Sequence, residues 1–208
     1  MLGSERRRSR RPKQLELPLP STWGGQRVGA GRKPGVGRKN VPHRARVRHV
    51  PAHPVHVVLR SKVRSLRSQL LFPAVRRALA RANRARGDFR IVHFSVQADH
   101  VHLIVEADAV RSLSPGVQGL AVRVARAVNR VVSRRGALWG GRYFARDLSS
   151  PRAVKHAVRY VLDNFRKHGE RVRGDRDPCS SVVYEVRRSG AHEHVPISVP
   201  KTWLGRFE

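Results

Sequence analysis

The stretch Asp99–Glu106, with the sequence DHVHLIVE, is the most informative part of this chain. Two histidines flank one valine within an apolar run that is typical of a buried β-strand. Because successive side chains of a strand point to opposite faces, His100 and His102 share one face and the apolar residues between and after them share the other. The sequence therefore predicts a strand that covers a packed core and presents two imidazoles on its other face.

Two neutral imidazoles on one rigid strand can bind a divalent ion, but they need a third ligand to complete a site. The alternative is a strand whose solvent face carries two histidines by chance, since short motifs are weak evidence. His192 and His194 repeat the spacing around Glu193, but their loop context favours an exposed polar tail. His53 and His56 are three residues apart, so we expect them on opposite faces of a strand.

Composition points to a polyanionic partner. The 208 residues include 44 Lys and Arg against 14 Asp and Glu, a formal net charge of +30. Such an excess is attracted to nucleic acid, the common polyanion. No apolar run approaches the roughly 18 residues of a membrane-spanning helix, and no apolar signal-peptide region begins the chain. We expect a soluble, intracellular protein without a membrane partner, in which the single Cys179 forms no internal disulfide.

Residues 1–48 have no periodic apolar pattern and are rich in Gly, Arg, Lys and Pro. This composition predicts a disordered basic arm, because it cannot bury enough surface to offset the cost of ordering. Within it, residues 31–35 (GRKPG) resemble an AT-hook for the A·T minor groove. Arg32, Lys33 and Arg38 are the candidate DNA contacts there, and a generic phosphate-binding tail is the alternative.

The remaining pattern has the order βα, ββ, αβ, α. Apolar, β-branched runs predict strands over residues 54–60, 89–96, 100–106 and 142–148. Helices are expected from Pro73 to Gly87, after an N-cap at Ser114, and from Pro151 to about His168. In the middle helix an apolar stripe lies opposite a run of arginines. Such a run is usually a solvated face, but arginines without interspersed acids suit phosphate contacts better than solubility. The candidate DNA contacts on this helix are Arg123, Arg126 and Arg130.

The last helix displays a tyrosine. Its apolar residues fall within an arc of about 100°, whereas Tyr160 projects about 140° from the centre of that arc. Asn164 follows one turn later on the same flank. A tyrosine used for packing belongs in the stripe, so we interpret Tyr160 as a presented side chain; an amphipathic tyrosine lying along the surface is the alternative.

Together these features resemble the HUH single-tyrosine transposases and, within them, the REP-associated tyrosine transposases, a family of bacterial proteins. The resemblance covers about residues 50–169 and is based on VQADHVHLIVE, WGGRYFARDL and VRYVLDN. Many relatives carry Asn at the position of Asp99 and Pro at the position of Phe165. The resemblance implies a ferredoxin-like α+β domain over residues 49–169, with helices packed on one face of an antiparallel sheet. Residues 170–208 would be an extension of unknown role.

The resemblance also implies roles for individual residues. His100 and His102 would be metal ligands, Asn164 the third ligand, Tyr160 the nucleophile, and Mg²⁺ or Mn²⁺ the ion. Arg142, Lys155 and Arg159 would contact DNA, and positive charge near the phenol would favour the phenolate, whose ordinary pKa is about 10.

The expected function is metal-dependent cleavage and joining of single-stranded DNA through a 5′-phosphotyrosine, on DNA hairpins. We expect a monomer or homodimer in the bacterial cytoplasm, associated with the nucleoid. The alternatives are an inactive, domesticated DNA- or RNA-binding protein on the same scaffold and a basic RNA-associated structural protein. Tyr143 and Tyr184 are rival nucleophiles, and a carboxylate-dependent nuclease would need three converging acids from Asp99, Glu106, Asp147 and Asp163.

Overall fold

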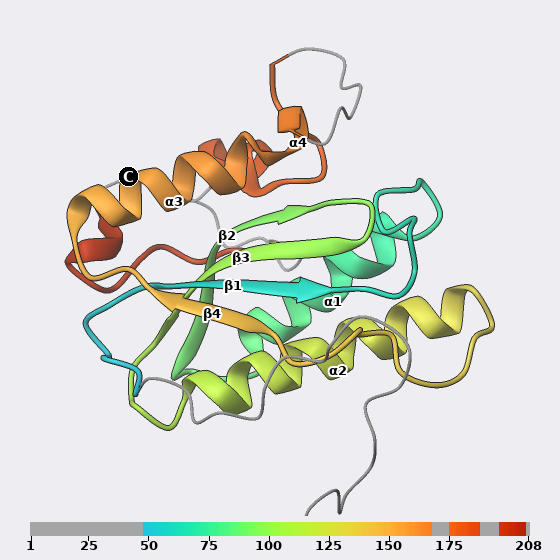
Figure 1. Ribbon diagram of the computed structural model, residues 1–208, viewed down its shortest axis with the longest axis horizontal. Coiled ribbons are helices and arrows are strands. Elements are labelled where there is room, and N and C mark those ends of the chain that lie inside the picture. Colours follow the sequence, from blue (N-terminus) through green and yellow to red (C-terminus); the bar gives the residue numbers. More distant parts are fainter. Residues whose placement is uncertain (1–47, 168–174, 188–195, 207–208) are drawn as a thin grey trace, which may run out of the picture. The chain divides into compact units, whose positions relative to one another are not determined.

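A four-stranded antiparallel sheet is the centre of the structure, a computed structural model that describes residues 48–167, 175–187 and 196–206 (Figure 1). The strands lie in the order β2-β3-β1-β4. Their bounds are β1 Val55–Arg60, β2 Phe89–Val96, β3 His100–Ala107 and β4 Phe144–Asp147. The helices are α1 Phe72–Arg84, α2 Leu113–Val131, α3 Pro151–Leu162 and α4 Asn164–Lys167, and the 3₁₀ helices are η1 Ser181–Arg187 and η2 Leu204–Arg206. The βαββαβ succession in this strand order is ferredoxin-like, so the predicted α+β class is confirmed.

The predicted hairpin of β2 and β3 is present. Val96 pairs with Val101 and Ser95 with His102, and the Gln97 N–H donates to the His100 carbonyl at 2.8 Å to close the turn. β1 pairs with β3 on its other side, with Val58 opposite His102. β3 is therefore a central strand, and both faces of its side chains are buried.

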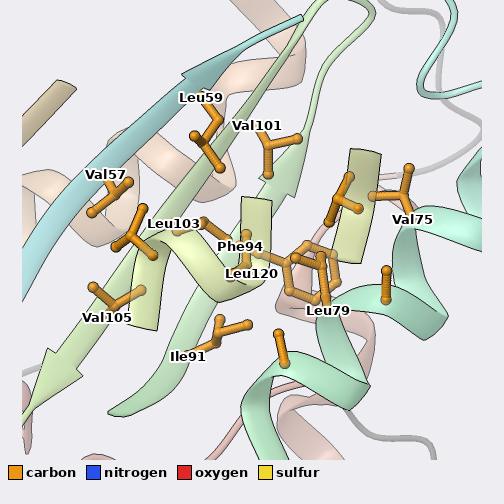
Figure 2. Close-up of a cluster of buried hydrophobic side chains, with 14 of the residues drawn as sticks. Val57, Leu59, Val75, Leu79, Ile91, Phe94, Val101, Leu103, Val105 and Leu120 are labelled. Atoms are coloured by element: carbon orange, nitrogen blue, oxygen red, sulfur yellow. The ribbon is translucent and has the colours of Figure 1, made fainter. Parts of the chain in front are cut away.

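One face of the sheet packs against α1 and α2. Figure 2 shows this core, in which strand residues such as Val57 and Leu103 meet Leu79 of α1 and Leu120 of α2. The predicted apolar stripe of α2 is buried there, as the period of 3.6 residues requires. A Cβ added to Gly116 of α2 would overlap the ring of a core phenylalanine, so the helix approaches the sheet closely at that point.

The other face of the sheet packs against α3. Val154, Val158 and Val161 of this helix form a second apolar cluster with Val92 of β2 and Ile104 of β3. Figure 1 shows α3 and the α1–α2 pair on opposite sides of the sheet. The expectation that helices pack on one face therefore holds for α1 and α2, while α3 covers the face that carries the histidines.

Two helix boundaries differ from the sequence prediction. α2 begins at Leu113, so its N-cap is Ser112 and not Ser114; the Ser112 hydroxyl donates to Asp88 at 2.6 Å. α3 has the expected cap, in which the Ser150 hydroxyl accepts from the Ala153 N–H at 3.2 Å. It ends at Leu162, however, and α4 follows as a separate short helix.

The C-terminal segments that the structure describes are bound to the core, although no periodic pattern predicts this. Arg67 forms a bidentate ion pair with the buried Asp177, with N–O distances of 2.8 and 2.9 Å. Glu106, which is fully buried, accepts hydrogen bonds from Arg90, from the backbone of Lys201 and from the hydroxyl of Thr202. These contacts attach residues after the predicted domain to Arg67, between β1 and α1, and to β3.

Three candidate DNA contacts in the arm, Arg32, Lys33 and Arg38, and the second His-x-His pair at residues 192–194 lie outside the described residues. None of the helices in the described ranges is long and apolar enough to cross a bilayer.

Candidate functional site

The candidate site is a cavity of about 880 Å³ between α3 and the face of the sheet that carries the histidines. β1 and β3 form its floor with His56, Val58 and His102, and α3 contributes Tyr160. Cationic and imidazole side chains surround it, from β4 and along α3: Arg146, Arg152, His156 and Arg159.

Three histidines and the tyrosine form one aromatic cluster, of which His56, His102 and Tyr160 line this cavity. The ring centroids of His100 and His102 are 4.8 Å apart, and those of His102 and Tyr160 are 5.5 Å apart, both in edge-to-face arrangements. The ring of His56 is stacked on that of His102 at 5.3 Å and meets Tyr160 edge-on at 5.9 Å. The structure thus brings together three of the four residues that the sequence singled out.

The two histidines of β3 both use Nδ1 for a hydrogen bond. Nδ1 of His100 donates to the Asp99 carboxylate at 2.6 Å, and this bond lowers the pKa of Asp99. Nδ1 of His102 lies 3.0 Å from Nε2 of His56. Each imidazole is thereby held in position through its Nδ1.

His56 is the site residue that the sequence analysis missed. It lies on β1 opposite Ile104, so it shares the face of His102. The sequence-based comparison of His56 with His53 alone did not place it beside His102. Burial, with the charge of Arg146 adding to it, lowers the pKa of His56 to about 4. His56 is therefore a neutral imidazole at neutral pH. The alternation of VHVVLR could have placed His56 beside the histidines, given a β1–β3 pairing.

Tyr160 is presented as predicted. Its side chain is 38% exposed at the cavity, while the apolar stripe of α3 is turned toward the sheet. Tyr143 packs at the edge of the core on the opposite face, and Tyr184 packs against Phe94 with a centroid distance of 6.1 Å. Of the three tyrosines, all within the described residues, Tyr160 is the one in ring contact with His102.

Asn164 occupies a different environment from Tyr160. Because α3 ends at Leu162 and Asp163 has non-helical ψ, Asn164 begins α4 and does not extend the exposed flank of Tyr160. It is fully buried, and neither Nδ2 nor Oδ1 has a hydrogen-bond partner among the described residues. A buried amide without partners costs about 1–3 kcal/mol, so such a group calls for a ligand.

The four carboxylates of the rival mechanism do not converge. Asp99 binds His100, Glu106 binds Arg90 and the C-terminal segment, Asp147 lies 3.8 Å from His49, and Asp163 lies 3.6 Å from Arg159. Within the described ranges, no group of three or more His, Cys, Asp or Glu side chains is arranged to hold a metal.

Two imidazoles and an amide, the ligand set that the resemblance implies, would suit a divalent ion. The Asp99–His100 bond repeats a common arrangement in which a carboxylate orients a ligand histidine. Together with the partnerless amide of Asn164, these features fit a metal.

The candidate DNA contacts within the described residues lie in three places. Arg159 lines the cavity, whereas Lys155 is exposed elsewhere on α3 and Arg142 precedes β4, and neither of these two is among its lining residues. Arg123, Arg126 and Arg130 line a separate groove between α1 and α2.

Known proteins provide an independent comparison. No curated protein matches the chain in sequence. The solved structure of a REP-associated tyrosine transposase bound to a REP hairpin superposes with a TM-score of 0.58 at 20% identity, over 74% of this chain and 90% of that chain. This likeness shows the fold. A candidate transposase from Deinococcus radiodurans R1 gives a TM-score of 0.40 at 14% identity, over 65% of this chain and all of the other.

The family model for IS200-like transposases matches residues 49–164. This span runs from His49, before β1, to the buried Asn164 at the start of α4. This span is more than half of the 208 residues and contains the whole histidine and tyrosine cluster. The chain therefore belongs to the IS200-like transposase family.

Proposed function

We propose that this protein is a metal-dependent enzyme that cleaves and rejoins single-stranded DNA through a 5′-phosphotyrosine at Tyr160. The observation that carries the proposal is the edge-to-face contact of Tyr160 with His102, at 5.5 Å, in a cavity bordered by arginines. Membership in the transposase family supports DNA processing as the general activity.

The ligands of the metal would be Nε2 of His100, Nε2 of His102 and Oδ1 of Asn164. Mg²⁺ or Mn²⁺, when bound, polarises the scissile phosphate and offsets the charge that develops on its oxygens. The protein's own part is to hold the two rings on a buried central strand. A ligand position that does not move keeps the phosphate aligned with the tyrosine.

His56 would act as a positioning residue. The 3.0 Å contact requires that one of the two nitrogens, Nδ1 of His102 or Nε2 of His56, carries the proton. If His102 donates, its Nε2 has the lone pair that a metal needs; if His56 donates, the His102 proton moves to Nε2 and blocks binding. We propose that His56 accepts the bond and so fixes the ligand form of His102.

Tyr160 would supply the attacking oxygen. Its Oη forms a bond to the phosphorus, the bond from phosphorus to the 3′-oxygen breaks, and the strand ends in a free 3′-hydroxyl. The phenol proton leaves to solvent, which reaches this side chain because it is 38% exposed, and the leaving oxygen takes up a proton in turn. Since the phosphodiester is conserved in the adduct, attack by another 3′-hydroxyl rejoins the strands without ATP.

The substrate would be a DNA strand that enters the cavity and carries a hairpin beside the cleavage position. Arg146, Arg152 and Arg159 border the cavity, and guanidinium groups suit phosphate oxygens in geometry and charge. The hairpin is proposed because the similar transposase structure was solved with a REP hairpin bound.

Covalent capture tests the proposal. The wild-type protein is incubated with Mg²⁺ or Mn²⁺ and labelled single-stranded hairpins, and protein-linked DNA is separated by denaturing electrophoresis. Tyr160→Phe should retain fold and DNA affinity but lose the adduct, because only the attacking oxygen is removed. Tyr143→Phe is the matched control and should retain it. An undiminished adduct in Tyr160→Phe, or its loss in Tyr143→Phe alone, would refute the assignment.

A further inference from the structure

A second strongly basic surface lies between α1 and α2, on the face of the sheet opposite Tyr160. A groove of about 480 Å³ runs between the two helices. Its floor is made of small apolar side chains, Ala74, Ala78 and Ala127. Five exposed arginines line it: Arg77, Arg81, Arg123, Arg126 and Arg130.

Within the described part of the chain, the residues that line this groove do not neutralise its charge. No carboxylate is among its lining residues. The surrounding sequence provides none either, because residues 48–87 and 109–146 contain no Asp or Glu. Arg123 donates to the Gly119 carbonyl at 3.0 Å, and among the residues that the structure describes none of the five arginines forms an ion pair with a carboxylate. Five like charges gathered in one hollow favour an anionic partner.

The chemistry of the lining identifies the kind of partner. A planar guanidinium group can bind two phosphate oxygens at once, so a row of arginines favours a partner with several phosphates in series over a single anion. The groove is lined by no aromatic side chain for stacking a base and no amide or carboxylate for reading a base edge. Such a surface contacts a backbone without recognising its sequence.

We propose that the α1–α2 groove binds the sugar-phosphate backbone of a nucleic acid, separately from the strand at Tyr160. The two surfaces are on opposite faces of the sheet, since α1 and α2 pack with Val57 and α3 packs with Ile104. From Arg123 to Arg130 the helix rises about 10 Å, which corresponds to about three phosphates of one duplex strand. The inference rests on the proposed function only in taking DNA as the partner.

Salt-dependent binding tests this groove. The variant Arg81→Gln/Arg126→Gln/Arg130→Gln removes three of its charges, and Arg48→Gln/Arg111→Gln/Arg135→Gln removes three exposed charges outside it. Affinity for labelled duplex and single-stranded DNA is measured at several salt concentrations. We expect the groove variant to lower the log–log salt slope by about 2–3 on duplex DNA, at about 0.9 for each phosphate contact, and the control to lower it by less than 1.

The two DNA forms and two base compositions give further outcomes. A loss of affinity for duplex DNA alone would mean that the groove binds a paired stem. An equal loss of affinity for duplex and single-stranded DNA would mean that it binds the backbone of either form. Because the groove is proposed to ignore sequence, G·C-rich and A·T-rich DNA should lose affinity alike. Arg81→Lys/Arg126→Lys/Arg130→Lys keeps the charge and should keep most of the slope.

The result is independent of the tyrosine chemistry. At saturating protein the groove variant should still form the adduct, since the groove lies away from Tyr160. Equal affinity and slope in the groove and control variants would overturn the groove proposal, whatever the adduct shows. A groove-dependent slope without any adduct in the wild-type protein would instead overturn the proposed function and leave the groove standing.

Discussion

Nε2 of His56 lies 3.0 Å from Nδ1 of His102, and the two rings are stacked with centroids 5.3 Å apart. This contact joins the two central strands on the face that α3 covers. In the proposed site it would also set which nitrogen of His102 binds a metal, because a hydrogen bond at one ring nitrogen sets the tautomer at the other. A residue on β1 would then position a candidate ligand on β3.

The first prediction concerns this pair. His56→Phe retains an aromatic ring over His102 but removes the acceptor, so His102 no longer has a partner that keeps its proton on Nδ1. We expect Mn²⁺ affinity to fall about 10- to 100-fold, the usual effect of removing a group that orients a ligand. Isothermal titration calorimetry and the electron paramagnetic resonance signal of bound Mn²⁺ measure it.

Two further variants complete this experiment. His56→Gln restores an acceptor oxygen and should recover part of the Mn²⁺ affinity, which a purely packing role would not explain. His53→Phe is the matched control on the preceding loop and should bind Mn²⁺ as the wild type does. Unchanged Mn²⁺ affinity in His56→Phe would show that His56 does not set the tautomer.

The second prediction concerns the three candidate ligands. His100→Ala and His102→Ala should each abolish metal-dependent cleavage, whereas Asn164→Ala should weaken it less, because water replaces a neutral oxygen ligand more readily than an imidazole. Asn164→Ala should also leave stability unchanged or raised, since it removes an amide without hydrogen-bond partners. Cleavage and thermal melting are measured on the same samples. Cleavage that persists in chelator with both histidines replaced would exclude this mechanism.

The sequence was sufficient for the sheet and for most of the site. Alternation in DHVHLIVE placed both histidines on one face, and the helical period separated Tyr160 from its apolar stripe, because both periods follow from local backbone geometry. The sequence did not predict that His56 lies at the site, because its proximity to His102 depends on the pairing of β1 with β3. This pairing brings together two residues that are 46 positions apart in the chain. Periodicity within one element carries no information about such a pairing.

The sequence did not predict where α3 ends, for a different reason. No glycine or proline marks the break at Asp163, so the apolar pattern alone predicted a helix as far as His168. The break separates the environments of Tyr160 and Asn164. The sequence also did not predict that the C-terminal segments bind to the core, because they bind through individual polar contacts such as Arg67–Asp177 and not through a periodic apolar face.

The third prediction tests whether those segments belong to the folded domain. Asp177 is buried and accepts two hydrogen bonds from Arg67, which is itself largely buried. Asp177→Ala leaves that guanidinium without its partner and should lower the free energy of unfolding by about 3 kcal/mol. Asp175→Ala is the control, since Asp175 is 99% exposed and lies 3.8 Å from Arg166; its effect should stay within about 0.5 kcal/mol.

Chemical denaturation with urea measures both changes. Equal stability of the two variants would mean that the Arg67–Asp177 ion pair does not stabilise the folded domain. Asp177→Asn can still accept one hydrogen bond from Arg67 and should fall between the wild type and Asp177→Ala.

The fourth prediction concerns the approach of α2 to the sheet. A Cβ on Gly116 would overlap the ring of Phe89, which is buried at the start of β2. Gly116→Ala gains about 1 kcal/mol of helix propensity but must displace a packed ring, and overpacking of a core costs about 1–3 kcal/mol. Because the overlap is with a rigid ring, we expect an overpacking cost of about 3 kcal/mol, at the top of that range, and therefore a net loss of about 2 kcal/mol.

Gly119, one turn along the same helix, is the matched control for that loss. A Cβ there meets the end of the flexible Arg123 side chain, which can move aside. Gly119→Ala should therefore leave the protein equally stable or more stable by up to about 1 kcal/mol. Thermal melting should separate the two variants by several degrees, at about 2–4 °C for each kcal/mol. Replacing Phe89 with Leu should reduce the cost of Gly116→Ala, and a double-mutant cycle without such coupling would show that this contact does not limit the approach of the helix.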